Sequence, residues 1–289
     1  MSTNMRCRAR GVTLLELLVV LMILSIILTA AVKTWDVTLE RGRAQTTASK
    51  LDQLVKVIVG DPDYIVAGQR ADFGFVGDMG RVPNNLRELV VAPSGSTLWR
   101  GPYIRSTFNQ SDIGYRTDGW GDTIIYGYEV YRELPDGKES LWVRSYGGRG
   151  VADRSRWQTL FLPYSYDALT QNEVDGQIVD VRGDSPLGVT DAVRKGYILD
   201  GLSVRLYYPS AFGTETFEEY IGAPAADFRF IGKPQGVRRI VAKFVNFHWT
   251  QRESTMTTQD VPVYPLAPSV GASGILMRLS VDWDQVHFL

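Results

Sequence analysis

The chain has 289 residues, of which 44% are hydrophobic and 22% are charged, so it can bury one large core or two ordinary ones. Its 31 basic and 32 acidic residues leave a formal net charge of −1, which argues against a nucleic-acid partner because such proteins usually carry a basic excess. The one cysteine is Cys7, so an exported portion beyond it must fold without a disulfide.

Two contrasting segments open the chain. Residues 1–11 are polar and carry three arginines, whereas residues 12–32 are almost wholly apolar. As a helix, this span of 21 residues would be about 31 Å long, which is enough to cross a bilayer once. Arginines ahead of the span favour a cytoplasmic amino terminus and place the remainder of the chain across the membrane.

Glu16 is the exception within the apolar span. A carboxylate at the middle of a bilayer costs of the order of 2.5–3.5 kcal/mol on insertion scales, and a position near the helix start reduces that cost. Cleavage after Gly11 would free an amine at Val12, which would be mostly cationic at neutral pH. Glu16 would lie one turn from this amine, or would meet the amine of a staggered neighbour.

The sequence RGVTLLEL at residues 10–17 resembles the class III signal of type IV pilins and type II secretion pseudopilins. The resemblance implies that residues 1–11 are a prepilin leader, and that a prepilin peptidase cuts after Gly11 and methylates the amine of Val12. It also implies that Glu16 assists docking into a growing filament. Loss of the leader arginines would change the formal net charge from −1 to −4.

Three other interpretations fit the apolar span less well. An ordinary secretory signal cut after Ala31 would have a longer apolar region than usual, and that region would contain an acid. A plain signal anchor would carry Glu16 by chance. A core helix of a soluble protein would have to hide 21 residues that include a single charge.

The apolar helix is predicted to continue to residue 60, with residues 12–32 crossing the membrane. No glycine or proline interrupts residues 12–41, and Asp61 and Pro62 supply a stop. Apolar residues recur on one helical face at Ala44, Ala48, Leu51, Val55 and Ile58. The second half of the helix over 12–60 is therefore expected to cover a sheet.

Residues 61–155 are predicted to form a pseudopilin-like globular region. Residues 123–132 (TIIYGYEVYR) alternate as a half-buried strand does, residues 134–138 (LPDGK) suit a turn, and residues 140–146 (SLWVRSY) suit a return strand. The fold class expected from these elements is α+β, with the long helix packed on an antiparallel sheet.

Four short elements of this region resemble, in the same order, elements of major pseudopilins. They are residues 82–89 (VPNNLREL), 101–104 (GPYI), 118–122 (DGWGD) and 144–150 (RSYGGRG). In that family the loop after the last strand binds calcium. Here Arg149 replaces the family's aspartate and leaves only Asp153 as a candidate metal ligand. A glycine turn without calcium, and hence no cofactor, is the favoured interpretation.

Residues 156–289 continue beyond the usual length of a major pseudopilin and are predicted to form an additional β-rich domain. An antiparallel sandwich or an extension of the sheet fits these residues, in which no long helical period appears. The expected strands are residues 178–182, 203–208, 228–231, 239–249 and 275–283. Five aromatic residues between positions 207 and 220 suggest either core packing, which is favoured, or an exposed binding patch.

The chain is expected not to be an enzyme. Its only histidines are His248 and His287, and the sequence contains no G-x-S-x-G, H-E-x-x-H or C-x-x-C motif and no phosphate-binding glycine loop. The sequence therefore gives no candidate for a nucleophile paired with a base.

These patterns predict a structural pilin-like subunit that a prepilin peptidase processes and that assembles into the pseudopilus of a type II secretion-like system for protein export. Its expected partners are that peptidase, other pilin-like subunits, an inner-membrane assembly platform and membrane lipid, without nucleic acid. The expected location is the bacterial inner membrane, crossed once, with a periplasmic carboxy-terminal domain and a periplasmic or extracellular filament. The alternative is a membrane-anchored minor or tip pilin, or a binding module whose carboxy-terminal β-domain recognises a carbohydrate or a protein.

Overall fold

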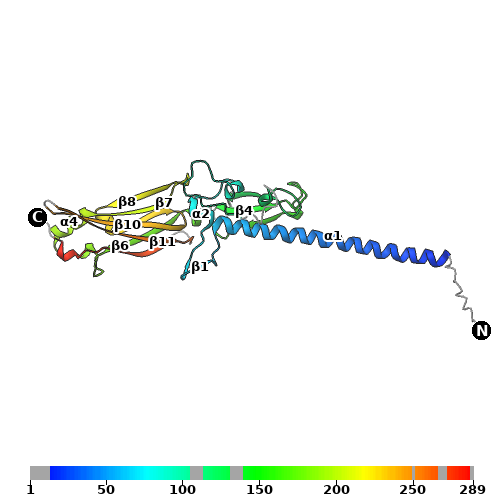
Figure 1. Cartoon of the computed structure of the whole chain (residues 1–289), viewed down its shortest axis with the longest axis horizontal. Coiled ribbons are helices and arrows are strands. Elements are labelled where there is room, and N and C mark those ends of the chain that lie inside the picture. Colours follow the sequence, from blue (N-terminus) through cyan, green and yellow to red (C-terminus); the bar gives the residue numbers. More distant parts are fainter. Residues whose placement is uncertain (1–13, 105–112, 131–138, 249–250, 266–271, 287–289) are drawn as a thin grey trace, which may run out of the picture.

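The chain forms a long helix followed by an elongated head. The computed structural model describes residues 14–104, 113–130, 139–248, 251–265 and 272–286. Helix α1 (Leu14–Val59) leads from the amino-terminal end into the head, which continues along nearly the same line (Figure 1). A smaller sheet lies beside the second half of α1, and a larger β-rich part lies beyond the end of the helix.

α1 is one unbroken helix of 46 residues, about 69 Å long. Its first half is exposed, whereas Leu51, Leu54 and Ile58 of its second half are buried in the head. The helix ends at Val59, and Gly60 follows with a φ of +91°, a left-handed conformation that commonly terminates helices. The predicted long helix is therefore confirmed from residue 14 onward.

The smaller sheet has the order β3-β4-β5 and is antiparallel throughout. Its strands are β3 (Ile125–Val130), β4 (Glu139–Ser145) and β5 (Gln158–Phe161). The predicted hairpin is present as β3 and β4, and one face of the sheet shares a buried core with α1. Leu169 of α3 (Tyr166–Thr170) belongs to the same core, so the packing continues past the predicted boundary between residues 155 and 156.

Short elements connect α1 to this sheet. They are β1 (Ile65–Val66), β2 (Gln69–Arg70), α2 (Gly74–Met79) and the 3₁₀ helices Leu86–Leu89 and Gly114–Arg116. The Asn85 side chain accepts a hydrogen bond from the Arg87 N–H at 3.0 Å and caps the first of these 3₁₀ helices. The family-like element at residues 82–89 thus contains a short 3₁₀ helix.

The larger β-rich part is a sandwich of two sheets with one core between them. The four-stranded sheet has the order β11-β10-β7-β8, and the three-stranded sheet has the order β12-β6-β9. The strands are β6 (Asn172–Val179), β7 (Leu202–Pro209), β8 (Glu215–Ile221), β9 (Asp227–Lys233), β10 (Gly236–His248), β11 (Gln251–Val263) and β12 (Ala272–Arg278). Side chains from both sheets, including Leu206, Phe230 and Phe244, are buried together. The additional sandwich-like region is therefore confirmed.

Strand direction in the sandwich differs from the sequence-based expectation. The prediction of an antiparallel sandwich is wrong for β6 and β12, which pair in parallel with Ile178 opposite Met277. Alternation of apolar and polar residues records which face of a strand is buried, and it carries no information about strand direction. The chain changes sheets between β11 and β12, and the direction of β12 follows from that crossing.

Four elements of the sandwich are absent from the sequence-based expectation. The missed strands are β8 and β11, and the missed helices are α4 (Ala192–Gly201) and α5 (Ala223–Ala226). α4 is a short helix of 10 residues, and the side chain of Asp191 caps it by accepting from the Val193 and Arg194 N–H groups. β11 is a strand of 13 residues that pairs with β10 along its whole length, and its many polar residues conceal the strand pattern.

Buried hydrogen bonds join the two parts of the head. The Gln235 amide donates from Nε2 to the carbonyl oxygens of Val59 at 2.8 Å and Phe73 at 3.0 Å. A second contact is less buried: the Thr97 and Leu98 N–H groups both donate to the Gly213 carbonyl at 3.0 Å. The sandwich is thus fixed to the last residue of α1.

Candidate functional site

The exposed first half of α1 is the main candidate site. Large apolar side chains from Leu14 to Val32 are exposed all around the helix, at 45% to 84% of their surface. Among the described residues, α1 is the single helix with the length and composition needed to cross a membrane. Such a surface requires cover from lipid or from other protein chains. The alternative of a buried core helix does not agree with this exposure.

Hydroxyl groups within the exposed helix are satisfied locally. The Thr29 hydroxyl donates to the Ser25 carbonyl at 2.8 Å, and the Thr34 hydroxyl donates to the Ala30 carbonyl at 2.9 Å. Each bond joins a side chain to the backbone four residues earlier. These groups therefore need no water or neighbouring chain to satisfy them in an apolar environment.

Glu16 lies in the first turn of α1. A carboxylate at this end of a helix interacts favourably with the partial positive charge of the first backbone N–H groups. Gly11 and Val12 lie outside the described residues, so the cleavage site and the pairing of Glu16 with an amine stay predictions.

A loop of the smaller sheet holds α1 where the exposed half meets the head. Asp118 is buried in this loop, and its Oδ1 accepts from the Trp120 and Asp122 N–H groups, each at 2.8 Å. Its Oδ2 accepts from the Ser145 hydroxyl of β4. The carboxylate thereby fixes the loop to the sheet. We call residues 118–122, together with Arg156, the helix seat.

The helix seat contacts the backbone of α1 directly. The Gly119 N–H donates to the Thr47 hydroxyl at 2.9 Å, and this hydroxyl donates to the Arg43 carbonyl at 2.9 Å. A Cβ at position 119 would lie 2.4 Å from the Arg43 carbonyl oxygen. Glycine at this position therefore allows the loop to lie against the helix.

Glu40 of α1 receives two side chains of the helix seat. The Trp120 indole Nε1 donates to Oε2 at 3.0 Å, and an Arg156 guanidinium nitrogen lies 3.2 Å from the same oxygen. These contacts lower the pKa of Glu40, with the Trp120 hydrogen bond as the largest cause and Arg156 and Arg43 as further causes. Trp120 lies in the family-like element at residues 118–122, but nothing in the sequence points to Glu40 as its partner.

The predicted metal ligand Asp153 is engaged by protein groups. Its Oδ1 accepts from both the N–H and the hydroxyl of Ser155, and its Oδ2 lies 3.0 Å from Arg149. The Ser155 hydrogen bonds, followed by that from Arg149, lower the pKa of Asp153 to about 2. Within the described ranges, no group of three or more His, Cys, Asp or Glu side chains is placed to hold a metal. This arrangement tests neither calcium binding at Asp153 nor the favoured turn without calcium, so both stay predictions.

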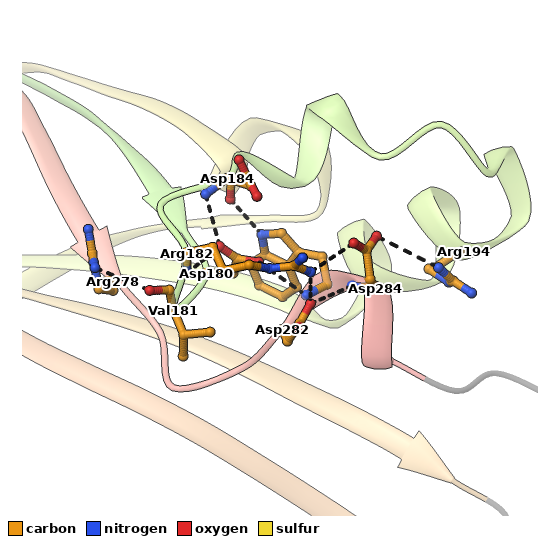
Figure 2. Close-up of polar contacts among 9 residues, drawn as sticks. Asp180, Val181, Arg182, Asp184, Arg194, Arg278, Asp282 and Asp284 are labelled. Carbon is orange, nitrogen blue, oxygen red and sulfur yellow. Dashed lines mark hydrogen bonds and ion pairs between the residues drawn. The ribbon is translucent and has the colours of Figure 1, made fainter.

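An aspartate-rich network closes the end of the sandwich farthest from α1. Figure 2 shows Arg182 between Asp180 and the pair Asp282 and Asp284. Burial alone would raise the pKa of Asp180, but hydrogen bonds from the backbone N–H groups of Asp184, Trp283 and Arg182 outweigh it, and the pKa is lowered. The Arg182 guanidinium lies between these carboxylates. It therefore joins the last described segment, which carries Asp282 and Asp284, to the turn after β6.

A cleft of about 570 Å³ lies between α2 and the sandwich. On one wall, the Tyr103 hydroxyl donates to Asp78 at 2.9 Å, and burial raises the pKa of that carboxyl. On the other wall, Arg238 is 4% exposed and donates to the Pro234 carbonyl at 3.1 Å. Burial lowers the pKa of Arg238 to about 9. The described residues that line the cleft supply hydrogen-bond donors and acceptors but no pair of nucleophile and base.

The aromatic patch suggested by the sequence is divided between surface and core. Phe212 is 80% exposed and Phe217 is 49% exposed, whereas the Tyr220 ring stacks on the buried Phe230 ring at 4.9 Å. Arg239 covers the Tyr207 ring at 4.4 Å. The side chains of both histidines, His248 and His287, lie outside the described part of the chain.

Comparisons with known proteins agree with the exposed helix. The family model of the prokaryotic N-terminal methylation motif matches residues 6–32. The type II secretion system core protein G of Xanthomonas campestris pv. campestris is 29% identical over 121 residues, which cover 42% of this chain and 70% of the relative. No solved structure matches the chain significantly. The predicted resemblance is thereby confirmed: the chain is pilin-like, with a prepilin-type amino terminus and a likeness to core protein G.

Proposed function

We propose that a prepilin peptidase cuts this pilin-like chain after Gly11 and methylates the amine of Val12. The processed chain then assembles through α1 into the pseudopilus of a type II secretion-like system that exports proteins. The methylation motif and the likeness to core protein G support this proposal.

The exposed apolar half of α1 is the observation that carries the proposal. Lipid covers this surface before assembly, when the subunit lies in the inner membrane. In the filament, the α1 helices of neighbouring subunits cover it. The charge of Glu16 favours the filament over the lipid. In the filament a neighbour's amine at Val12 would neutralise this carboxylate, whereas lipid chains offer it no positive charge. The rigid contact of Glu40 with Trp120 and Arg156 would then transmit the position of the helix to the head.

The proposal sets an orientation and a group of partners. Residues 1–11 lie in the cytoplasm before cleavage, and the head lies in the periplasm. The partners are the peptidase, the assembly platform of the inner membrane, and other pilin-like subunits that contact α1.

Substitution at the cleavage site tests processing. Gly11→Ala should leave the leader attached, and mass spectrometry of the membrane-extracted chain should find no terminus at Val12. Gly42→Ala is the control, because a Cβ at position 42 has no neighbour within 4 Å and the terminus should be normal. A methylated Val12 terminus in Gly11→Ala would refute the site.

The sandwich favours a second candidate, a minor or tip subunit whose β-domain binds a carbohydrate or a protein. It lies beyond the carboxy-terminal end of α1 and in line with it (Figure 1), where it would obstruct the stacking of further heads. Immunogold labelling of sheared filaments separates the two candidates. Label along the whole filament supports the repeating subunit, whereas label confined to one end supports the tip.

A further inference from the structure

The end of the head nearest the exposed half of α1 is rich in arginine. Five of these arginines lie on α1 or in the loop between β4 and β5, and we call them the arginine face: Arg41, Arg43, Arg149, Arg154 and Arg156. The smaller sheet, which carries this loop, is the part of the head that lies nearest the exposed half of α1 (Figure 1). The Gly148 N–H donates to the Asp122 carboxylate at 3.0 Å, so the loop is held beside the helix seat.

Positive charge at this end exceeds the negative charge. Arg144 of β4 lies behind the arginine face, and the carboxylates at this end are those of Glu40, Asp118, Asp122 and Asp153. Glu40 lies 3.2 Å from Arg156, and Asp153 lies 3.0 Å from Arg149. Arg41 and Arg154 are exposed, and neither forms an ion pair with another residue in the described ranges. These two guanidinium groups are therefore available to an anion.

A cavity of about 360 Å³ opens beside the arginine face. Glu40 and Arg41 line it from α1, and Arg156 and Trp157 line it from the loop. The Glu40 carboxylate is already engaged by the Trp120 indole and by Arg156, which reduces its repulsion of an anion. The cavity thus offers a recess for an anionic group next to an arginine without an ionic partner.

The position of the arginine face along α1 brings it within reach of a membrane surface. With residues 12–32 in the hydrocarbon core, Arg41 lies nine residues beyond the core, or about 14 Å along the helix. The headgroup layer on each side of a bilayer takes up roughly 5–8 Å of that distance. Helix side chains tilt toward the amino-terminal end, here the membrane, and electrostatic attraction extends about 8 Å at physiological salt. Long arginine side chains can therefore interact with lipid phosphates.

The loop between β4 and β5 favours a lipid over a phosphate ion from solution. Val151 lies between Arg149 and Arg154 in this loop and is 62% exposed. The Arg154 guanidinium lies 5.2 Å from the centre of the Trp157 ring. Apolar and tryptophan side chains among basic ones suit the boundary between lipid headgroups and acyl chains. A free phosphate ion would gain nothing from Val151.

We propose that the arginine face binds the phosphate groups of anionic phospholipids in the leaflet from which α1 emerges. The proposal rests on the membrane placement of α1 proposed above, but it does not depend on filament assembly. The contact holds the head against the membrane before assembly, in addition to the anchor that α1 provides. A subunit that enters a filament must break the contact, so anionic lipid opposes its extraction.

Energy transfer between the head and the lipid headgroups tests this contact. Cys7→Ser removes the one cysteine, and Ala152→Cys, at an exposed position of the loop, carries a donor fluorophore. Single copies of the full chain are placed in nanodiscs of phosphatidylcholine, alone or mixed equally with phosphatidylglycerol, with an acceptor on a trace of the headgroups. Transfer should be roughly twofold higher in the mixed membrane, and about 0.5 M NaCl should abolish the increase, because screening shortens to about 4 Å.

Two matched pairs of substitutions assign the increase to the arginine face. Arg41→Gln combined with Arg154→Gln should reduce it by about threefold or more. Arg87→Gln combined with Arg278→Gln removes the same charge from exposed positions outside the arginine face and should leave the increase unchanged.

Three results would overturn the proposal. They are equal transfer in the two membranes, an increase that survives high salt, and an increase that the substitutions at Arg41 and Arg154 leave intact. A chain that inserts into the nanodiscs and gives any of these results would leave the function proposed above standing. Failure of the chain to insert would overturn the membrane placement of α1 together with the lipid contact.

Discussion

The indole of Trp120 donates a hydrogen bond to the carboxylate of Glu40 at 3.0 Å, across 80 positions of the chain. Glu40 lies on α1 at the point where the exposed half of the helix meets the head, and Trp120 lies in the helix seat. The bond therefore joins the portion of the chain proposed to assemble to the head.

Trp120→Phe should weaken this joint while keeping an aromatic ring in the seat. We expect the melting temperature of the full chain in detergent to fall by roughly 2–4 °C near neutral pH, because the carboxylate loses its indole donor. The effect should depend on pH. The pKa of Glu40 is lowered in the folded state, so the bond contributes stability above the ordinary glutamate pKa of about 4.3, and this contribution is lost as pH falls through the lower folded value.

The matched comparison is Trp99→Phe, because the Trp99 indole donates to a backbone carbonyl, that of Glu88, at 2.8 Å. Its destabilisation should not vary with pH around the Glu40 titration. An equal difference between the parent and Trp120→Phe at pH 3 and pH 7 would contradict the role assigned to the Glu40 carboxylate.

Asp118→Asn should destabilise the head by about 1.5–3 kcal/mol. The buried carboxylate accepts from two backbone N–H groups and the Ser145 hydroxyl, and the amide would turn a donor toward one of these partners. Urea unfolding of the full chain in detergent measures the change. Asp52→Asn, on the exposed side of α1, should alter the free energy of unfolding by less than about 0.5 kcal/mol. Equal effects of the two substitutions would show that Asp118 does not organise the loop.

Local sequence patterns predicted the helices and strands whose formation depends on residues close by in the chain. Contacts between residues far apart in the chain were not predictable from the sequence. The long helix was predictable because the apolar span passes without interruption into a periodic face. The Glu40 contact was not, since a charged residue on an exposed helix has no sequence signal for a partner 80 residues later. β11 escaped detection because its partner β10 fixes its position, while its own side chains are largely polar.

Gly119→Ala should separate the helix seat from α1. The added methyl group would lie 2.4 Å from the Arg43 carbonyl oxygen, and neither backbone can yield without moving the helix or the loop. We expect a loss of about 1–3 kcal/mol in the free energy of unfolding, together with faster amide exchange at Thr47 and Gly119. The control is Gly188→Ala, since a Cβ there meets nothing within 4 Å. Unchanged exchange in Gly119→Ala would show that the seat tolerates the extra volume.

Gln235→Met should leave stability within about 1 kcal/mol of the parent, although two buried hydrogen bonds disappear. The Val59 carbonyl keeps its bond from Arg70, and the Phe73 carbonyl keeps its bond from the Gly77 N–H. The Gln235 Oε1 is buried and finds no partner among the described residues, so its removal also eliminates a polar group whose burial is unfavourable. Met preserves most of the side-chain volume.

Gln235→Ala provides the contrast, because it removes the same hydrogen bonds and leaves a cavity at the junction. It should cost about 2–3 kcal/mol, measured by urea unfolding under the same conditions. If Gln235→Met proved as destabilising as Gln235→Ala, the amide bonds rather than the packing would hold the sandwich to α1.

Glu16→Gln should separate processing from assembly. The substitution keeps the length of the side chain and its place in the first turn of α1, and it removes the charge proposed to meet a neighbour's amine at Val12. Mass spectrometry should find the terminus at Val12 unchanged. Disulfide linkage between two copies that carry Leu21→Cys in a Cys7→Ser background, oxidised in the membrane, should fall by about tenfold or more. Asp36→Asn is the control, because Asp36 lies on the same helix beyond the apolar span and is exposed. Full linkage in Glu16→Gln would mean that packing of the apolar surface alone directs the helices together.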